Sequence, residues 1–439
     1  MIPEGEAREA RLRRAARKYL LDTAEDQAFG VAERHFGVEL EFSIVDPSFM
    51  PMLGTAEAVW RQRGGFAVEQ ELGSFQIETN PPPEVLAPGA FHRLHQTLAA
   101  TVAAMEESCA GLGGGLLPIG LAPCLPPALF NAPGFFTQTD RYRASAAFSR
   151  RHRQEARIQF ERRPSMILPI GSAVALINEL HVHVEALSAE EIGLLFEAAQ
   201  DITPLLTALG ANSGWFDGER LQYVDHQVRL FAECEARPKD PRGAERVGFY
   251  PRPFEGLADY FDWTAAFPLW VEVDESQPRS IHQAIEKGYY GWVRLRLEDT
   301  PQPSLRVELR VPSVQPTLRE NVALAEWAVK AVVERARSGV SGLSVEHRRI
   351  NLERCACLGL DAEIYWNAGD GVKERPVVAV VDGLLADLGE GEYLSLLVPR
   401  LRRRMVPALL LANECERMGV TAGLEAYRSH FQWDEPYVA

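Results

Sequence analysis

The amino-acid sequence predicts an α+β fold in which helices flank one antiparallel sheet. Four separated segments alternate apolar and polar residues, which is the period-two pattern of strands that bury one face. Segments with Leu, Val and Ala at helical spacing stand between and after these strands. The chain shows neither a regular βαβ rhythm nor a G-x-G-x-x-G turn, which argues against a dinucleotide-binding parallel sheet.

The expected elements can be placed along the chain from this spacing. In the first half we expect a charge-rich helix at residues 5–20, strands at 36–45 and 74–79, a helix near 88–110, buried strand and loop over the Gly- and Pro-rich residues 111–139, and a basic helix at 141–162. In the second half we expect strands at 179–186 and 304–311 and helices near 188–209, 317–339, 376–388 and 391–418. Thr317 and Glu320 have the spacing of a capping box, so they predict where the long helix begins.

Composition and charge exclude several classes of protein. The 439 residues are 46% hydrophobic, which is enough for a large buried core. Forty-six Lys and Arg against 61 Asp and Glu give a net charge of −15, so we expect no broad electrostatic binding of nucleic acid. Six Cys without a C-x-x-C pair, and an N-terminus without a long apolar stretch, favour a cytoplasmic protein. No membrane partner is expected, because the longest uncharged stretch, residues 111–139, contains five prolines.

The four alternating segments carry an unusual set of polar residues. Period two places these side chains on one face: Glu39 and Glu41 in the first segment, Gln76 and Glu78 in the second, Glu179, His181, His183 and Glu185 in the third, and Arg306, Glu308 and Arg310 in the fourth. A sheet with one solvated face explains such alternation without any function. Solvated faces usually also contain Thr, Ser, Lys and Gln, whereas these faces consist almost entirely of Glu, His and Arg. Carboxylates two residues apart on a strand repel one another unless cations lie between them, so the set favours a metal-binding face.

The residue types on this face suit phosphate and carboxylate chemistry. Carboxylates with an occasional imidazole are hard ligands for Mg²⁺ or Mn²⁺, and these ions bridge nucleotide phosphates. Neighbouring arginines can neutralise a phosphoryl group or bind a substrate carboxylate through two hydrogen bonds.

Five short motifs follow one another along the chain. They are Gly37-x-Glu39-x-Glu41-Phe42, Gln76-Ile77-Glu78-Thr79, His181-Val182-His183-Val184, the segment from Ala208 to Ser213 with Gly218, and Val307-Glu308-Leu309-Arg310. Together they resemble the glutamate-cysteine ligase type 2 and carboxylate-amine ligase family, within the glutamine synthetase-like superfamily. The resemblance extends over roughly residues 36–430.

The resemblance implies a fold and a reaction. The fold would be a glutamine synthetase-like antiparallel active-site sheet with flanking helices, divided into an N-terminal helical extension, residues 1–30, and a carboxylate-amine ligase catalytic domain, residues 31–439. The γ-phosphoryl group of ATP would pass to the carboxylate of glutamate or a glutamate-like acid, and an amine would then attack the acyl phosphate to form an amide. ATP and Mg²⁺ or Mn²⁺ would be the cofactors, and a small carboxylate and an amine the substrates. A homo-oligomer stays open.

The resemblance also implies roles for individual residues. Metal ligands or their near neighbours would be Glu39, Glu41, Glu78, His183 and Glu308. Nucleotide or substrate contacts would come from Glu41, His181, Asn212 and Ser213, and the catalytic arginines would be Arg310, Arg306 and Arg141. Arg141 begins a basic stretch that ends at Arg163, and this stretch is either a solvated helix or a surface that guides anions.

The chain departs from the family pattern at several positions. Family members tend to have Gly or Thr before the His strand, Ser and Pro around the Ala-Asn-Ser core, and Asp after the Glu-x-Arg strand. Here these positions hold Glu179-Leu180, Gly210 and Gly214, and Ser313, and Arg229 is the nearest stand-in for an expected Ser-x-Arg. The metal face is intact whereas the amino-acid pocket looks altered. Two functions therefore stay open, namely a ligase for glutamate or another carboxylate, and a ligase-like scaffold or ligand-binding protein that has lost turnover.

Overall fold

The fold is built around an eight-stranded sheet. A computed structural model describes residues 4–26, 31–130, 132–143, 147, 155–235, 247–265, 267, 276–286, 290–298, 304–340 and 342–438. The strand order is β13 (Val293–Glu298), β14 (Ser304–Leu309), β8 (Leu180–Glu185), β1 (His35–Val45), β3 (Gln76–Thr79) and β2 (Val68–Gln70), and β4 (Glu84–Val85) and β5 (Gly115–Leu117) also pair with β1. Every pair in this sheet is antiparallel, which confirms the α+β prediction.

The register of the sheet brings the predicted polar residues together. Glu41 lies opposite Glu78, and Glu39 lies opposite His181. His183 lies opposite Glu308 on the next strand. Because directly opposed residues point to the same face, the polar side chains of four segments far apart in the sequence share one surface. The prediction that these segments lie side by side is confirmed.

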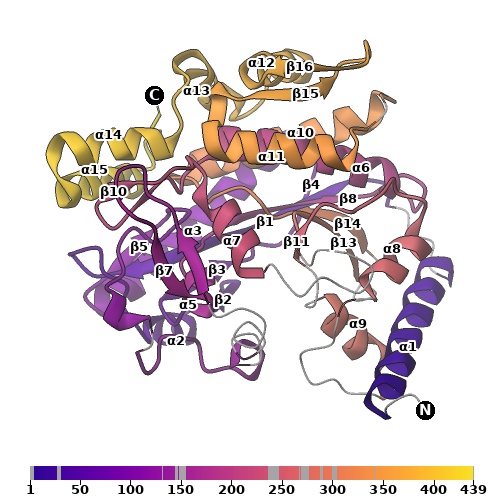
Figure 1. Cartoon of the computed structure of the whole chain (residues 1–439), viewed down its shortest axis with the longest axis horizontal. Helices are drawn as coiled ribbons and strands as arrows, with labels where there is room; N and C mark the ends of the chain where they lie inside the picture. Colours follow the sequence, from indigo (N-terminus) through magenta and orange to yellow (C-terminus); the bar gives the residue numbers. More distant parts are fainter. Residues whose placement is uncertain are drawn as a thin grey trace.

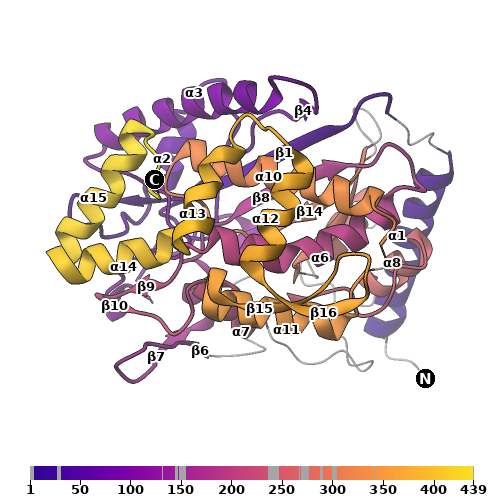
Figure 2. The same cartoon turned by 90° about the horizontal axis from the view of Figure 1, so that it is seen from above.

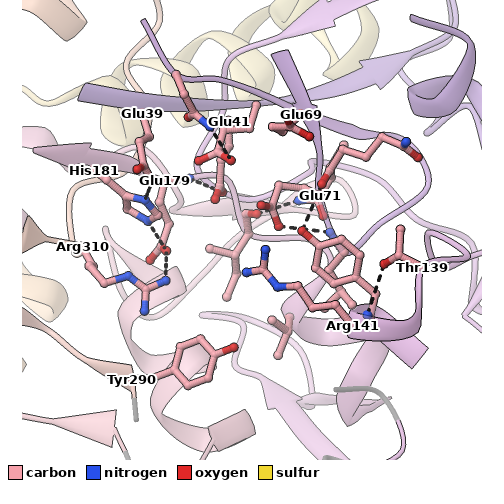
Figure 3. Close-up of a pocket in the computed structure, with 18 of the residues that line it drawn as sticks. Glu39, Glu41, Glu69, Glu71, Thr139, Arg141, Glu179, His181, Tyr290 and Arg310 are labelled. Carbon is pink, nitrogen blue, oxygen red and sulfur yellow. Dashed lines mark hydrogen bonds and ion pairs between the residues drawn. The ribbon is translucent and has the colours of Figure 1, made fainter. Parts of the chain in front are cut away.

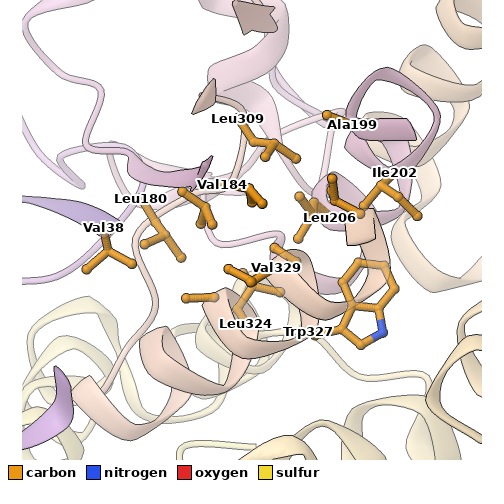
Figure 4. Close-up of a cluster of buried hydrophobic side chains, with 14 of the residues drawn as sticks. Val38, Leu180, Val184, Ala199, Ile202, Leu206, Leu309, Leu324, Trp327 and Val329 are labelled. Atoms are coloured by element: carbon orange, nitrogen blue, oxygen red, sulfur yellow. The ribbon is translucent and has the colours of Figure 1, made fainter. Parts of the chain in front are cut away.

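The apolar back of the sheet packs against two long helices, α6 (Ile192–Gly210) and α10 (Leu318–Arg337). Figure 4 shows this layer, in which sheet residues Val38, Leu180, Val184 and Leu309 meet Ala199, Ile202 and Leu206 of α6 and Leu324, Trp327 and Val329 of α10. In Figure 1, α6, α10 and α11 (Val345–Leu358) lie on one side of the sheet. The opposite face is therefore left for the polar residues.

Among the described residues, one helix is long and apolar enough by length and composition to cross a membrane. It is α6, and 83% of its most apolar window is buried inside the protein. This burial matches its contacts with the sheet and with α10.

Buried charges join the three helices of this layer. Asp201 of α6 accepts hydrogen bonds from Arg335 of α10 at 2.9 Å and from Arg348 of α11 at 2.8 Å. All three side chains are at most 5% exposed. Removing one partner of such a buried pair leaves an uncompensated charge, so the helices are held in one arrangement behind the sheet.

Helix α10 begins as the sequence predicts. The Thr317 hydroxyl accepts a hydrogen bond from the Glu320 backbone N–H at 3.1 Å and donates to the Glu320 carboxylate at 2.9 Å. Both residues are fully buried. The capping-box prediction is confirmed.

We expect Thr317→Ala to lower the free energy of unfolding by about 1–2 kcal/mol, because a buried cap loses both hydrogen bonds. Urea unfolding measures the change. Ser344 caps α11 by accepting from the His347 backbone N–H but is exposed, so Ser344→Ala is the matched control and should cost less. Equal losses in the two variants would contradict the assignment of a buried, two-bond cap at Thr317.

The N-terminal helix α1 (Glu4–Asp26) packs on α8 (Leu257–Thr264) and α9 (Pro278–Glu286) at one end of the molecule. Leu12 and Ala16 meet Ile281 and Ile285 there. Figures 1 and 2 show α14 (Pro407–Met418) and α15 (Val420–Trp433) at the opposite end. The remaining elements are α2 (Thr55–Arg61), α3 (Ala90–Gly111), α5 (Ile170–Val174), α7 (His226–Glu235), α12 (Val377–Leu388) and α13 (Val398–Arg403), with the short strands β6 (Glu155–Ile158), β7 (Met166–Pro169), β9 (Trp215–Phe216), β10 (Glu219–Arg220), β11 (Val247–Gly248), β12 (Tyr290–Gly291), β15 (Glu363–Asn367) and β16 (Val372–Pro376).

Two predicted helices are wrong in part. Of the predicted basic helix at 141–162, residues 141–143 and 147 are helical. Residues 144–146 and 148–154 lie outside the described residues, and 155–158 form β6. Buried Ala156 and Ile158 alternate there with exposed neighbours, which is a strand pattern. The single helix at 391–418 is divided into a 3₁₀ turn, α13 and α14, because Arg404 adopts a left-handed conformation with φ of 50° and ends α13.

Candidate functional site

The polar face of the sheet forms the wall of a cavity of about 740 Å³. Figure 3 shows its centre, with carboxylates from the sheet on one side and arginines on the other. The predicted site residues that line it are Glu39, Glu41, Glu78, His181, Arg141 and Arg310. Glu179, which the period-two pattern places on the polar face, lines it as well. So do five residues that were not predicted, namely Glu69, Glu71, Tyr290, Arg294 and Arg296.

Three carboxylates crowd together at the β2 side of the cavity. The ligand oxygens of Glu41, Glu71 and Glu78 lie within 4.8 Å of one another. Burial, followed by the charge of neighbouring carboxylates, raises the pKa of Glu41 and of Glu78 well above its ordinary value. Buried acids at this spacing need either protons or a cation between them. The donor set therefore fits Mg²⁺ or Mn²⁺, which prefer carboxylate oxygens.

His181 links the central carboxylates. Its Nδ1 lies 2.7 Å from Glu39 and its Nε2 lies 3.0 Å from Glu179. Burial alone would lower the pKa of His181, but hydrogen bonds to Glu179 and Glu39 raise it well above the ordinary value. Each ring nitrogen thus has a carboxylate acceptor, and His181 balances negative charge as an imidazolium. The same atoms also belong to two candidate cation clusters, one with Glu39 and Glu78 and the other with Glu41 and Glu179.

Two arginines face these carboxylates across the cavity. Arg310 lies just beyond β14, with Nη2 3.8 Å from Glu179 and its guanidinium carbon 5.1 Å from the ring centre of Tyr290. Burial lowers the pKa of Arg141, but the neighbouring Tyr142, Glu71 and Tyr290 outweigh it, so the pKa is raised overall. Both guanidinium groups point toward the centre of the cavity in Figure 3. A fixed positive group opposite a cation-binding wall suits an anionic ligand between them.

A second cavity of about 320 Å³ adjoins the first along β1 and β8. His183 and Arg306 line it, and it shares Glu39 and Asn80 with the larger cavity. The rest of its wall is mostly apolar, from Val31, Phe36, Val38, Pro81 and Pro83. Glu308 lies at 1% exposure beneath the sheet surface and forms a candidate cation cluster with Glu39 and His183.

Asn212 and Ser213 are not among the residues that line these two cavities, and their contact with nucleotide or substrate stays a prediction. Asn212 donates to the Val314 carbonyl at 2.7 Å, and Ser213 donates to Asp225 at 2.7 Å. Both side chains are 1% exposed. They therefore join the loop after α6 to the interior behind Glu179.

The buried carboxyl group of Asp225 predicts a dependence of stability on pH. Burial raises its pKa to about 8, although hydrogen bonds from Ser213 and Ser313 oppose the shift. The ordinary value is near 4, so the native state holds more protons than the unfolded state between about pH 4 and 8. The contribution of Asp225 to stability is full below pH 4 and is lost as the pH rises through 8.

We expect Asp225→Asn to flatten this fall, by up to about 1.4 kcal/mol per pH unit for a single group. The Asn oxygen can still accept from both serines, so the fold is retained. Urea unfolding at pH 5, 6, 7 and 8 in EDTA gives the slope. An unchanged slope would show that Asp225 is ionised throughout this range.

Comparison with known proteins identifies the family. The model of the glutamate-cysteine ligase family 2 (GCS2) matches residues 35–382. A Mycobacterium ulcerans (strain Agy99) protein named "Putative glutamate--cysteine ligase 2" is 28% identical over 219 residues. That alignment covers 48% of this chain and 48% of the relative, so the chain matches about half the length of this relative.

The fold is also similar to a solved structure, the glutamate–cysteine ligase of Francisella tularensis in complex with AMP. The TM-score is 0.56 at 12% identity, covering 92% of this chain and 90% of the other, and it supports the shared fold. The family model covers most of the chain, including all strands that carry the polar face. The chain therefore belongs to the glutamate-cysteine ligase family 2.

Proposed function

We propose that this chain is an ATP-dependent carboxylate–amine ligase that acts on glutamate or a glutamate-like carboxylate. A carboxylate oxygen of the substrate attacks the γ-phosphorus of ATP and ADP leaves. The amine nitrogen then attacks the acyl carbon, phosphate leaves, and the amine loses a proton as the amide forms. Family membership supports the reaction class.

The observation that carries the proposal is the division of one cavity into two chemical sides. The buried carboxylates of Glu41 and Glu78 lie on the sheet, the half-buried carboxylate of Glu71 lies just after β2, and the guanidinium groups of Arg141 and Arg310 lie opposite. Divalent cations held by the carboxylates would neutralise the phosphate oxygens of the nucleotide. The arginines hold the substrate carboxylate and the transferring phosphoryl group in place by charge-assisted hydrogen bonds. Their position opposite the sheet orients the two reactants toward each other.

The positions that depart from the family pattern, Gly210, Gly214 and Ser313, are buried inside the protein. None of them lines either cavity. A Cβ atom at Gly210 would lie 2.6 Å from Leu324, and at Gly214 it would lie 3.2 Å from Ala408. Ser313 is fully buried and donates to Asp225. Glutamate with cysteine is therefore the first substrate pair to test.

The test is the release of ADP and phosphate from Mg²⁺ and ATP in the presence of a carboxylate and an amine. Glutamate is paired with cysteine, and then pools of other acids and amines are supplied. Release that needs both substrates, with an amide product found by mass spectrometry, supports the ligase. A chain that binds Mg²⁺ and ATP without turnover on any pair would support the scaffold alternative instead. Failure to bind the nucleotide would contradict both.

A further inference from the structure

The buried carboxylate of Glu308 forms an ion pair with an arginine from the neighbouring strand. Arg294 of β13 lies directly opposite Glu308 of β14. Its Nε donates to one carboxylate oxygen and its Nη2 donates to the other at 2.9 Å. Such a two-bond pair uses both oxygens of the acid in fixed geometry. A cation that binds either oxygen of Glu308 while Arg294 stays in place therefore lies beside the positive charge of the guanidinium group.

His183, in the same candidate cation cluster, is also held by an arginine. Arg306 Nε donates to His183 Nδ1 at 3.2 Å. An arginine N–H can only donate, so Nδ1 must be the acceptor, and the proton of a neutral ring then lies on Nε2. That nitrogen is 3.1 Å from Glu39. To bind a cation through Nε2, the ring must carry its proton on Nδ1, which the Arg306 donor blocks.

The cluster of Glu41, Glu71 and Glu78 differs in this respect. Within the described part of the chain, no Lys or Arg forms an ion pair within 4.0 Å of any of these three carboxylates. A cation can enter there without breaking a pair. A cation at the Glu39–His183–Glu308 cluster thus competes with arginine side chains, whereas a cation at the Glu41–Glu71–Glu78 cluster does not.

We propose that Arg294 and Arg306 hold the ligand groups of the Glu39–His183–Glu308 cluster when neither cation nor nucleotide is bound, and transfer to phosphate oxygens when the two enter together. The proposal rests on the proposed function, because it takes a phosphate-bearing nucleotide as the ligand. A cation that arrives alone either stays beside the like charge of Arg294 or separates Glu308 from it, and separation leaves a poorly solvated guanidinium without that acceptor. A nucleotide that arrives alone must take Arg294 from Glu308 and leaves a buried carboxylate unpaired. When both arrive, each displaced group gains a new partner, so the two bind cooperatively.

Two single substitutions test this exchange. One should strengthen the binding of Mn²⁺ without nucleotide, and the other should strengthen the binding of ADP without a metal ion. Arg294→Gln releases Glu308, so we expect the variant to bind Mn²⁺ at this cluster at least about tenfold more tightly without nucleotide, as one more Mn²⁺ per chain than the wild type at the same concentration. Electron paramagnetic resonance of free Mn²⁺ measures this uptake. Glu308→Gln releases Arg294, so we expect it to bind ADP in EDTA at least about tenfold more tightly than the wild type does. Isothermal titration measures that affinity.

The controls separate the exchange from a change of net charge. Arg296→Gln removes one positive charge from the same strand and face. Arg296 pairs with Glu286 at 3.0 Å and its Nε lies 3.9 Å from Glu308, so a much smaller gain in Mn²⁺ uptake than in Arg294→Gln is expected. The double variant Arg294→Gln/Glu308→Gln should lose both gains. Arg294→Lys keeps the charge without the two-bond geometry and should show a smaller gain. It also provides the measurement if Arg294→Gln fails to fold.

The outcomes are distinct from those of the proposed function. Unchanged Mn²⁺ uptake in the Arg294 variants together with unchanged ADP affinity in Glu308→Gln would overturn the exchange. Equal gains in Arg296→Gln would overturn it as well, because the effect would then be one of charge alone. A wild-type chain that binds no Mn²⁺-nucleotide would instead contradict the proposed function, whatever the gains without nucleotide.

Discussion

Replacing Glu78 by Gln is expected to slow turnover about a hundredfold or more. The substitution keeps the shape of the side chain but removes the negative charge from the cluster with Glu41 and Glu71. A bound metal ion supplies several kcal/mol of transition-state charge stabilisation, and each 1.4 kcal/mol is about tenfold in rate. ADP release with the best substrate pair measures the loss.

The same variant is expected to be more stable than the wild type at neutral pH without metal. Burial and neighbouring carboxylates raise the pKa of Glu78 well above its ordinary value, so the native state binds more protons than the unfolded state above that value. Its contribution to stability is present at acid pH and is lost as the pH rises through the raised pKa. Glu78→Gln removes this loss, and thermal unfolding in EDTA at neutral pH should show a higher Tm.

Glu69→Gln is the matched control for this experiment. Glu69 lies directly opposite Glu78 on β2 but is exposed and belongs to none of the candidate cation clusters. It should therefore show a much smaller loss of turnover and no gain in Tm. Near-wild-type turnover and an unchanged Mg²⁺-dependent shift in Tm for Glu78→Gln would remove Glu78 from the metal site.

Replacing Arg310 by Gln is expected to lower kcat by about 10²–10³. Arg310 is 11% exposed and stands between the carboxylates of Glu179 and Glu308, with its guanidinium facing the cavity. Loss of one preorganised donor to developing charge costs about this factor in other enzymes. Arg310→Lys should recover only part of the rate, because an ammonium group keeps the charge but lacks the planar fork of donors.

The division of the effect between kcat and KM shows what Arg310 does. A fall in kcat at constant KM would place its contact in the transition state, whereas a rise in KM alone would make it a binding group for the substrate. Arg143→Gln is the control, because Arg143 is exposed and pairs with Asp140 outside the cavity. Equal losses in the two variants would contradict a specific role for Arg310.

The polar face could be predicted because burial of one side forces a period of two on every strand. The segments around Glu39, Glu78, His183 and Glu308 all show that period, and all four lie in the sheet. Residues 293–298 alternate in the same way, so Arg294 carried a usable signal that the sequence analysis did not include. The sequence signal for Glu71 is weaker, because Glu71 follows a strand of three residues and lies outside regular secondary structure where it lines the cavity.

Other features depend on contacts that no local pattern encodes. Asn212 and Ser213 stand in a polar loop beside Gly214, and this composition suits a ligand contact as well as an internal one. Their partners, Val314 and Asp225, come from other parts of the chain. The pairing of Arg294 with Glu308 likewise depends on the register between β13 and β14, which the sequence pattern does not specify. The spacing of residues in the sequence predicts which side chains share the polar face of the sheet. Which of them contact one another depends on the tertiary structure.

The position of β1 in the sheet has a consequence for biosynthesis. Its Glu39 pairs with His181, 142 residues further along, and β8 in turn pairs with β14. During synthesis β1 therefore has no neighbour on its β8 side until about residue 185 has been made, and closure of such long loops slows folding. Until then its carboxylates and unpaired backbone edge face the surroundings. We expect nascent chains shorter than about residue 310 to depend on chaperones and to be cleaved readily by proteases, with protection gained only when β14 emerges.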